Sequence, residues 1–129
     1  KMTSDFLASS IQTNPVIIRN ILSQLRRAGL VRIARGTGGI TLERALKDIS
    51  FYDVYAAIEP VERGALFRFH ESPNPNCPVG KNIHKILDHK FTDIQSAMEA
   101  EMRKYTLEDI HRDLLCLNAV QGAVTQRSF

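Results

Sequence analysis

The chain has 129 residues, of which 43% are hydrophobic and 24% are charged. This composition is typical of one folded domain and excludes a disordered or collagen-like chain. Charged residues interrupt every long apolar stretch, so no segment reaches the roughly 18 apolar residues of a membrane span. The two cysteines, Cys77 and Cys116, are too few for a disulfide framework and favour a soluble protein of the reducing cytoplasm.

The charge of the chain is divided unevenly along its length. Residues 1–47 contain eight Lys or Arg against two acidic residues, a net charge of +6, whereas residues 48–129 contain nine against twelve, a net charge of −3. A basic first third indicates a module that faces a polyanion and is attached to a different kind of unit.

Two short helices are predicted at the start of the chain. The first is capped by Thr3 or Ser4 and ends near Gln12, and the second is capped by Asn14, runs from Pro15 to Ala28 and ends at Gly29. Such a pair is typical of a helix-turn-helix, although helical hairpins also occur in ordinary bundles. The second helix has an apolar core face at steps of three and four. This face consists of Ile18, Ile21, Leu22, Leu25 and Ala28.

A β hairpin is predicted directly after the second helix. Residues 30–34 alternate like a half-buried strand, the glycine-rich run 35–39 predicts a tight turn, and residues 40–42 return to strand character. A hairpin in this position, with Arg35 at its tip, is the wing of a winged helix, and its arginine can reach the minor groove. The alternative is a glycine turn that only reverses the chain and leaves Arg35 in solvent.

The rest of the chain is predicted to be helical on both sides of an irregular, proline-rich segment. A third helix is expected over residues 47–60, opened by Asp48 or Ser50. A long helix follows over residues 79–104. A capping pattern then begins a final helix over residues 107–117.

The expected fold is therefore mainly α with a small β wing, a winged helix-turn-helix followed by a long dimerisation helix. Residues 1–60 form the expected DNA-binding domain, and residues 61–117 contain the connecting loop, the long helix and the final helix. Residues 118–129 lack a clear pattern and are expected to be a loose tail.

The long helix carries an apolar stripe that a small domain cannot cover by itself. Counted over six steps from Ile83 to Tyr105, the apolar spacing averages about 3.67 residues, which is the period of a straight helix, and about 25 residues span roughly 37 Å. We expect a second copy of the chain to cover the stripe, and packing against residues 51–69 and the final helix is the alternative. The stripe consists of Ile83, Leu87, Phe91, Ile94, Met98 and Met102.

Five motifs follow one another in an order that is more specific than any single motif. They are Thr13–Val16, Leu25–Val31, Arg35–Gly39, Ile49–Tyr55 and Cys77–Gly80. Together they resemble the Rrf-two type of bacterial winged-helix regulators (BadM/IscR-like), over about residues 2–115. The resemblance implies a cytoplasmic homodimeric transcription factor, usually a repressor. It also implies that the long helix forms the dimer interface, and that the second helix and the wing bind a palindromic operator.

Two features depart from this family. Its members begin with another helix before residue 3, and we expect the absence of that helix here to expose the core faces of the two helices that follow. Iron–sulfur members carry three closely spaced cysteines before the dimer helix, because thiolates must converge on one cluster. This chain has only Cys77 there. The sequence therefore favours the cluster-free subgroup, without a cofactor.

Residues at the start of the second helix and in the wing, most of them polar, are the candidates for DNA contact. Arg19 is expected to read a guanine edge and Asn20 an adenine. Arg26 and Arg27 lie further along the helix and are expected to form only a solvated charge pair. The candidates are Thr13 and Asn14, which would hold phosphate, Val16, Arg19 and Asn20 in the helix, and Arg35 and Thr37 in the wing.

Other reactive side chains are weaker candidates for chemistry. Cys77 precedes the long helix, whose dipole would lower the pKa of the thiol and favour a redox role, and a packing role is the alternative. His84 and Asp88 could ligate a metal with Cys77, but a solvated pair is the expected arrangement. No phosphate loop, catalytic triad or carboxylate pair stands out, so the sequence predicts neither an enzyme nor a metal site.

These features predict a sequence-specific, DNA-binding transcriptional regulator, a repressor that acts as a homodimer on a pseudo-palindromic operator. The alternative is a protein–protein interaction module that uses the helical hairpin and the wing without binding DNA. Binding to DNA through several phosphates falls steeply with salt concentration, which distinguishes the two hypotheses.

Overall fold

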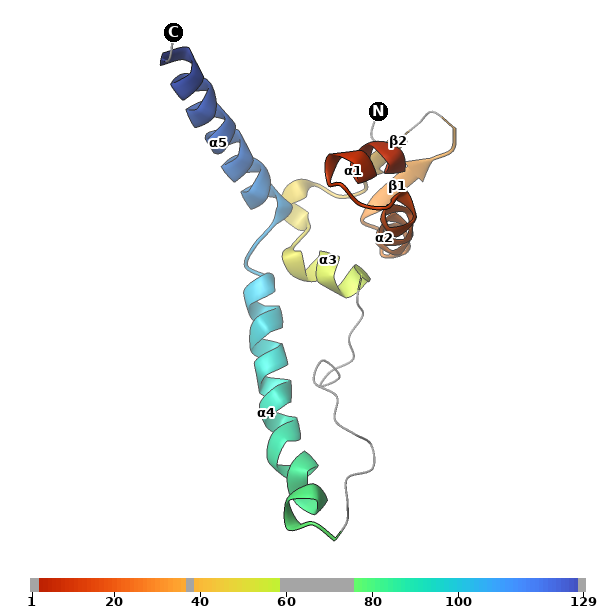
Figure 1. Cartoon of the computed structure of the whole chain (residues 1–129), viewed down its shortest axis with the longest axis vertical. Coiled ribbons are helices and arrows are strands. Elements are labelled where there is room, and N and C mark those ends of the chain that lie inside the picture. Colours follow the sequence, from red (N-terminus) through yellow and green to blue (C-terminus); the bar gives the residue numbers. More distant parts are fainter. Residues whose placement is uncertain (1–2, 37–38, 59–75, 128–129) are drawn as a thin grey trace.

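The computed structural model describes residues 3–36, 39–58 and 76–127. The chain is mainly helical with one small antiparallel sheet, as the sequence predicts (Figure 1). The elements before residue 59 form a head, from which two long helices, α4 (Pro78–Met102) and α5 (Leu107–Arg127), extend in different directions. The head contains α1 (Ser4–Ser10), α2 (Pro15–Arg27), β1 (Val31–Ala34), β2 (Gly39–Leu42), the 3-10 turn Leu46–Asp48 and α3 (Phe51–Ile58).

The turn between α1 and α2 is fixed by the side chains that cap the two helices. Thr3 Oγ1 accepts a hydrogen bond from the Phe6 N–H at 3.1 Å, and Asn14 Oδ1 accepts one from the Val16 N–H at 2.8 Å. Each bond satisfies a backbone donor that a helix leaves unpaired at its start. Gln12 reverses the chain between the helices with a φ of 54°. Both predicted helix starts are confirmed.

Gly29 ends α2 and turns the chain into the hairpin. It has a φ of 75°, which glycine adopts without steric cost. The Gly29 N–H donates to the Arg26 carbonyl and the Leu30 N–H donates to the Leu25 carbonyl, both at 3.0 Å. This Schellman arrangement satisfies carbonyl groups at the helix end. The predicted hairpin follows, with β1 and β2 paired antiparallel and Val31 opposite Leu42.

The core of the head is small and has two parts. The first joins α1 to α2 and contains Ala8, Ile18 and Leu22. The second joins the hairpin to the segment before α3 and contains Leu30, Val31 and Ile49. Leu25 and Ile40 pack against both parts and connect them. On α1, Phe6 and Ile11 are 56% and 62% exposed, so the core leaves part of the apolar surface uncovered.

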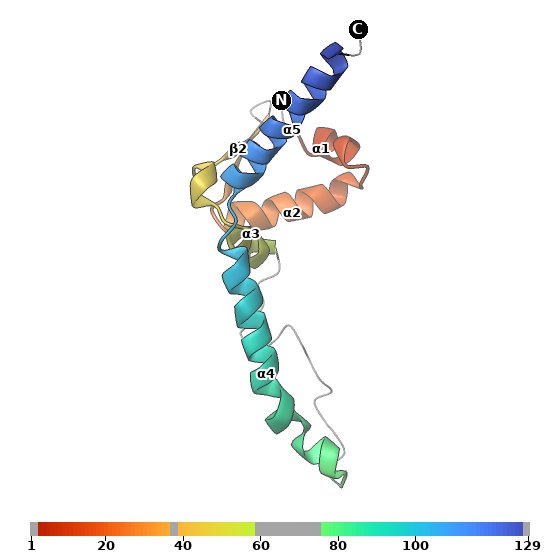
Figure 2. The ribbon, with the colours of Figure 1, turned by 90° about the vertical axis from the view of Figure 1, so that its left-hand side faces the viewer.

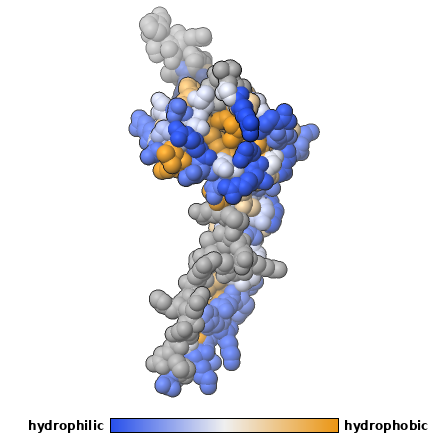
Figure 3. Space-filling view, turned by 90° about the vertical axis from the view of Figure 1, so that its right-hand side faces the viewer, coloured by the Kyte–Doolittle hydropathy of each residue, from blue (hydrophilic) through white to orange (hydrophobic). Residues whose placement is uncertain are grey.

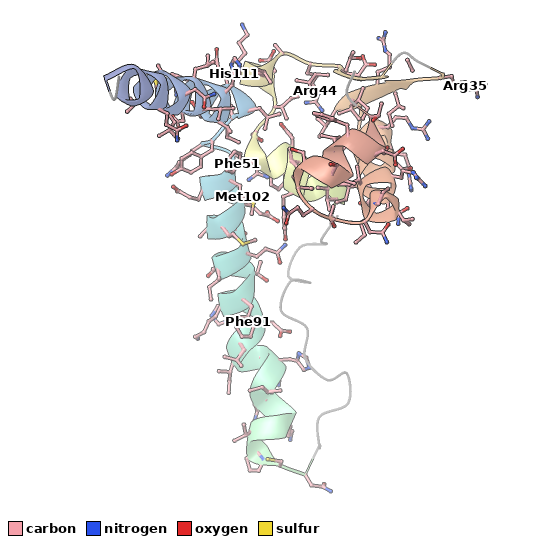
Figure 4. All side chains as sticks on the ribbon, turned by 45° about the horizontal axis from the view of Figure 1, so that its top comes forward. Arg35, Arg44, Phe51, Phe91, Met102 and His111 are labelled. Atoms are coloured by element: carbon pink, nitrogen blue, oxygen red, sulfur yellow. The ribbon has the colours of Figure 1, made fainter. Side chains whose placement is uncertain are left out.

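A short antiparallel bridge, which we call the joint, connects the head to the long helices. The Phe51 N–H donates to the Tyr105 carbonyl at 2.9 Å, and the Leu107 N–H donates to the Ile49 carbonyl at 3.0 Å. The Leu107 side chain packs against the buried core residues that include Ile49. In Figure 4, Phe51 and Met102 lie close to this junction, at the top of α4.

The helices on either side of the joint are capped in the same way. The Ser50 N–H donates to the Asp53 carboxylate at 2.9 Å, and the Asp53 N–H donates to Ser50 Oγ at 3.1 Å. Thr106 and Asp109 make the equivalent pair of bonds at 2.9 and 3.3 Å. The capping pattern predicted for the final helix is confirmed.

The third helix is shorter than predicted at its start. The sequence predicts a helix over residues 47–60 that is opened by Asp48 or Ser50, and the structure confirms Ser50, with α3 beginning at Phe51. The reason is that Ile49 and Ser50 take part in the joint, which needs an extended backbone, and that Ser50 then caps the helix. The predicted end, at Pro60, lies outside the described residues.

The final helix is longer than predicted. Helix α4 matches the expected long helix, but α5 continues to Arg127, so residues 118–127 are helical and the prediction of a loose tail was wrong. This segment contains no proline and one glycine, so nothing in it breaks a helix even though its apolar residues follow no clear period. Both ribbon views show α5 extending away from the head without packing along α4 (Figures 1 and 2). No described helix is long and apolar enough to cross a membrane.

Replacing Gly29 by Ala is expected to destabilise the chain by about 1 kcal/mol, because Ala is strained at a positive φ. A Cβ at this position would meet no atom within 4 Å, so the loss would come from the backbone and not from a clash. Gly29→Asn is the matched control and should lose less stability, since Asn tolerates the left-handed region better. Urea unfolding at one fixed protein concentration measures both differences, and equal losses would contradict this role of Gly29.

Candidate nucleic-acid interface

The first two turns of α2 present several of the predicted residues to solvent. Val16 is 53% exposed, the Arg19 side chain is 60% exposed, and Asn20 is also exposed. The opposite side of the helix carries Ile18 and Leu22, which are buried in the core. The structure therefore brings Val16, Arg19 and Asn20 together on the accessible side of α2.

The two residues before α2 are less free than the sequence suggests. Asn14 Oδ1 accepts the capping bond from the Val16 N–H, so the side-chain amide N–H groups of Asn14 are what remains for an external acceptor. Thr13 is half-buried, and its N–H donates to the Ala8 carbonyl at 2.9 Å. Both residues lie beside the start of α2, where the helix dipole favours an anion.

Arg19 lies near an acidic residue of the preceding helix. Arg19 Nη2 is 3.7 Å from Asp5 Oδ1, and the two side chains are 60% and 80% exposed. An exposed ion pair of this length contributes little to stability. The nearby Asp5 carboxylate does orient the Arg19 guanidinium group, which points along the side of α2 toward α1.

The hairpin places Arg35 at its far end. Figure 4 shows Arg35 at the tip, away from the rest of the head. The next residue, Gly36, has a φ of 72°, which a tight turn here requires of glycine. Thr37, the other predicted wing residue, lies outside the described residues. Figure 3 views the head from the side of α2 and the hairpin, where hydrophilic side chains surround a small apolar patch.

An ion pair that the sequence analysis missed spans the base of the hairpin. Arg32 Nε donates to Glu43 Oε1 at 2.6 Å, and Arg32 Nη2 donates to Glu43 Oε2 at 3.2 Å. The Arg32 guanidinium therefore lowers the pKa of the Glu43 carboxyl. Arg32 pairs with Thr41 in the sheet register, and Glu43, one residue past the end of β2, lies two residues further along and within diagonal reach. An arginine and a glutamate at this two-residue offset were the sequence signal that could have predicted the ion pair.

The predicted dimer stripe of α4 is only partly covered within the chain. Ile94 is 52% exposed, and the other five stripe residues are half-buried. Helix α3 packs against the C-terminal end of α4, whereas Phe91, nearer the middle of α4, lies well below the head (Figure 4).

Helix α5 adds an apolar surface that the sequence analysis did not single out. Its exposed apolar residues are Ile110, Leu114, Leu115, Leu117 and Val120.

Cys77 is the residue that precedes the first turn of α4. It is half-buried and makes no side-chain capping hydrogen bond, and the backbone N–H groups of Gly80 and Val79 in the first turn lower the pKa of its thiol. This confirms the predicted direction of the pKa shift, which favours the thiolate. Whether the thiol serves a redox function stays a prediction.

His84 and Asp88 form the solvated pair that the sequence predicts. His84 Nδ1 is 3.1 Å from Asp88 Oδ1, and the side chains are 42% and 60% exposed. In the part of the chain that the structure describes, no three His, Cys, Asp or Glu side chains come together in a way that could hold a metal ion.

Comparison with known proteins identifies relatives over most of the chain. The Rrf2 family model, described as an iron-dependent transcriptional regulator, matches residues 1–113. The chain is 40% identical to YwnA of Bacillus subtilis (strain 168), a candidate HTH-type transcriptional regulator, over 114 residues that cover 88% of this chain and 84% of YwnA. This is the family that the five sequence motifs resemble.

Two solved structures support the same relationship. The crystal structure of a candidate transcriptional regulator from Lactobacillus plantarum shares 32% identity with this chain at a TM-score of 0.73, and the match covers 95% of this chain and 85% of the other. The crystal structure of a candidate DNA-binding protein shares 34% identity at a TM-score of 0.68 and covers 85% and 84% of the two chains. The relatives are regulators and not enzymes.

The lowered pKa of Cys77 predicts that this thiol reacts with iodoacetamide faster at pH 7 than the thiol of an unstructured cysteine peptide, because a larger fraction is thiolate. The rate should rise with pH to a plateau that is reached at lower pH than for the peptide. A Cys116→Ser variant isolates the reaction of Cys77, and mass spectrometry follows it. A plateau at the pH of the peptide or above would contradict the prediction.

Proposed function

Because the chain belongs to the Rrf2 family of transcriptional regulators, we propose that it is a cytoplasmic homodimer that binds a pseudo-palindromic operator and represses transcription. The observation that supports this proposal most is the exposed first half of α2. It carries Val16, Arg19 and Asn20 beside a hairpin with an arginine at its tip. This is the arrangement by which a winged helix reads DNA.

In the proposed complex, α2 enters the major groove. Arg19 donates to the O6 and N7 acceptors of a guanine, and Asn20 pairs with the edge of an adenine. Thr13 and Asn14 hold a phosphate at the start of the helix, where the dipole assists them. Arg35 and Thr37 of the wing contact the adjacent minor groove, where a narrow groove attracts an arginine.

A second copy of the chain is proposed to cover α4. Ile94 on the predicted stripe is 52% exposed, and the apolar residues of α5 that lie beyond the joint are also exposed. The half-sites of such an operator lie about 34–36 Å apart. A helix of 25 residues spans about 37 Å, and the head lies at the C-terminal end of α4, so two copies joined antiparallel along α4 would separate their heads by about one turn of DNA.

The cysteines of this chain do not fit an iron–sulfur cluster of the three-cysteine type. Cys77 lies at the N-terminal end of α4, and Cys116 lies on α5, beyond the other end of α4. About 37 Å of helix separates the two ends of α4, whereas the thiolates of one cluster must converge on it. We therefore propose that the protein regulates transcription without such a cluster.

Replacing Arg19 by Ala is expected to weaken operator binding by about 1–3 kcal/mol and to reduce the preference between operator and unrelated DNA, since a base contact carries sequence information. The operator is obtained by in vitro selection of DNA sites with the full-length protein, which also gives the half-site spacing. Fluorescence anisotropy at fixed salt measures the affinity. Unchanged affinity and preference would remove Arg19 from the interface.

The same titration, repeated over a range of salt concentrations, tests the competing protein-interaction hypothesis. Several phosphate contacts require the logarithm of the binding constant to fall steeply with the logarithm of salt concentration. A flat response, or failure to select any DNA site, would favour a protein partner for the helical hairpin and the wing.

Replacing Ile94 by Asp is expected to convert the dimer into a monomer, because an unpaired charge would be buried in the proposed interface. The residue is 52% exposed in the single chain, so the fold of the chain should tolerate the change. His89→Asp is the matched control, an exposed residue about 140° away around the same helix. Sedimentation analysis reads the result, and a dimer retained by the Ile94 variant would place the interface elsewhere.

A further inference from the structure

An open trough runs along the side of α2, between that helix and β1. It consists of two neighbouring hollows, of about 430 and 350 Å³, that share Arg26 and Ile33. Arg32 and Glu43 lie in the first hollow, and Arg19 and Ser23 lie in the second.

Three arginines line this trough, and they differ in what they already bind. Arg32 is held by Glu43 through two hydrogen bonds, and Arg19 lies 3.7 Å from Asp5. The Arg26 side chain has no hydrogen bond or ion pair with any other residue in the described part of the chain. Arg26 is therefore the cation of the trough that is available to an external anion without breaking a bond.

The position of the trough identifies the anion. A sugar–phosphate strand separates the major groove of DNA from the adjacent minor groove. If α2 lies in the major groove and the wing reaches the minor groove, that strand must pass through the space between α2 and β1. The trough occupies this space, and its cationic lining complements a polyanion.

We propose that the trough between α2 and β1 is the seat of the DNA backbone, and that Arg26 binds a phosphate there. This inference rests on the proposed DNA-binding function and adds a residue that the sequence analysis treated as part of a solvated charge pair. Arg26 lies seven residues after Arg19, two turns along the same side of the helix. Arg27 lies about 100° further round and does not line the trough.

The remaining lining fits a nucleic-acid strand better than a small anionic molecule. Ile33, which is 39% exposed, contributes apolar surface against which a deoxyribose ring can pack, whereas Val31 and Leu22, which also line the trough, are buried. A site for a small molecule encloses most of its ligand. Both hollows of this trough are open to solvent, and Arg19 and Arg26, which line it, are exposed.

The first experiment compares Arg26→Gln with the wild-type full chain on two duplexes, the selected site and a random sequence of the same length. One lost phosphate contact should weaken binding to both duplexes about fivefold at 0.15 M salt, and it should reduce the salt slope by about 0.9. The ratio of the two affinities should not change, because a phosphate contact carries no sequence information. Arg44→Gln is the matched control. It removes the same charge at an exposed residue outside the trough, at the base of the hairpin (Figure 4), and should have a smaller effect.

The second experiment locates the phosphate. Single phosphates of the selected duplex are replaced by uncharged methylphosphonates, and both proteins are titrated against each duplex. The wild-type protein should lose affinity at a phosphate between the bases read by α2 and the minor groove under the wing. The Arg26→Gln variant should bind the duplex with that phosphate neutralised as tightly as it binds the unmodified duplex. This non-additivity is the coupling expected of a direct contact.

The outcomes separate this inference from the function on which it rests. Additive losses at every phosphate, a changed sequence preference in Arg26→Gln, or an affinity equal to that of the wild type would overturn the role of Arg26 while the protein still binds DNA. If the wild-type protein binds neither duplex in a salt-dependent manner, the proposed function fails and this inference fails with it. Equal unfolding curves for the two proteins exclude an effect through stability.

Discussion

The joint between the head and the long helices is the contact on which the arrangement of the molecule depends. Two backbone hydrogen bonds connect the segment that starts α3 to the segment that starts α5. Ile49, at 1% exposure, anchors one side in the core, and the Phe51 and Tyr105 rings lie with their centres 5.6 Å apart. The Arg103 guanidinium, 3.9 Å from the centre of the Tyr52 ring, adds a cation–π contact beside them. These contacts fix the direction in which α4 and α5 leave the head.

The small size of the core leaves much apolar surface that the proposed second copy would cover. In the described part of the chain six apolar residues are buried, whereas sixteen large apolar residues are more than about a third exposed. Full burial of one such side chain contributes roughly 1.5–3 kcal/mol. The partly covered stripe of α4 and the exposed side chains of α5 therefore represent a large share of the stability available to the molecule. Association along these helices would couple the fold of each head to the spacing of the two heads.

Sequence reasoning succeeded where the signal is local. The caps at Thr3 and Asn14 and the turn at Gly29 each depend on a few neighbouring residues, so one sequence is enough to predict them. The joint could not be predicted in this way, because Ser50 pairs with Thr106 across more than fifty residues and neither carries a mark of that pairing. The error over residues 118–127 has another cause. Helix α5 packs on the head at its first residue, Leu107, and then extends away from it (Figure 1), and a segment that extends away from the head need not show an apolar period.

The electrostatics of the basic third of the chain follow from the placement of its two acidic residues. Asp5 and Glu43 are the acids of residues 1–47, and each lies beside an arginine that lines the trough, Arg19 or Arg32. An arginine that is already oriented loses less conformational entropy when it binds, but it must also exchange one anion for another. In the proposed complex, such residues would respond to the correct DNA geometry more than to charge alone. Arg26 and Arg35 have no ion pair in the described part of the chain, so in the proposed complex the long-range attraction to a duplex would depend mainly on unpaired cations of this kind.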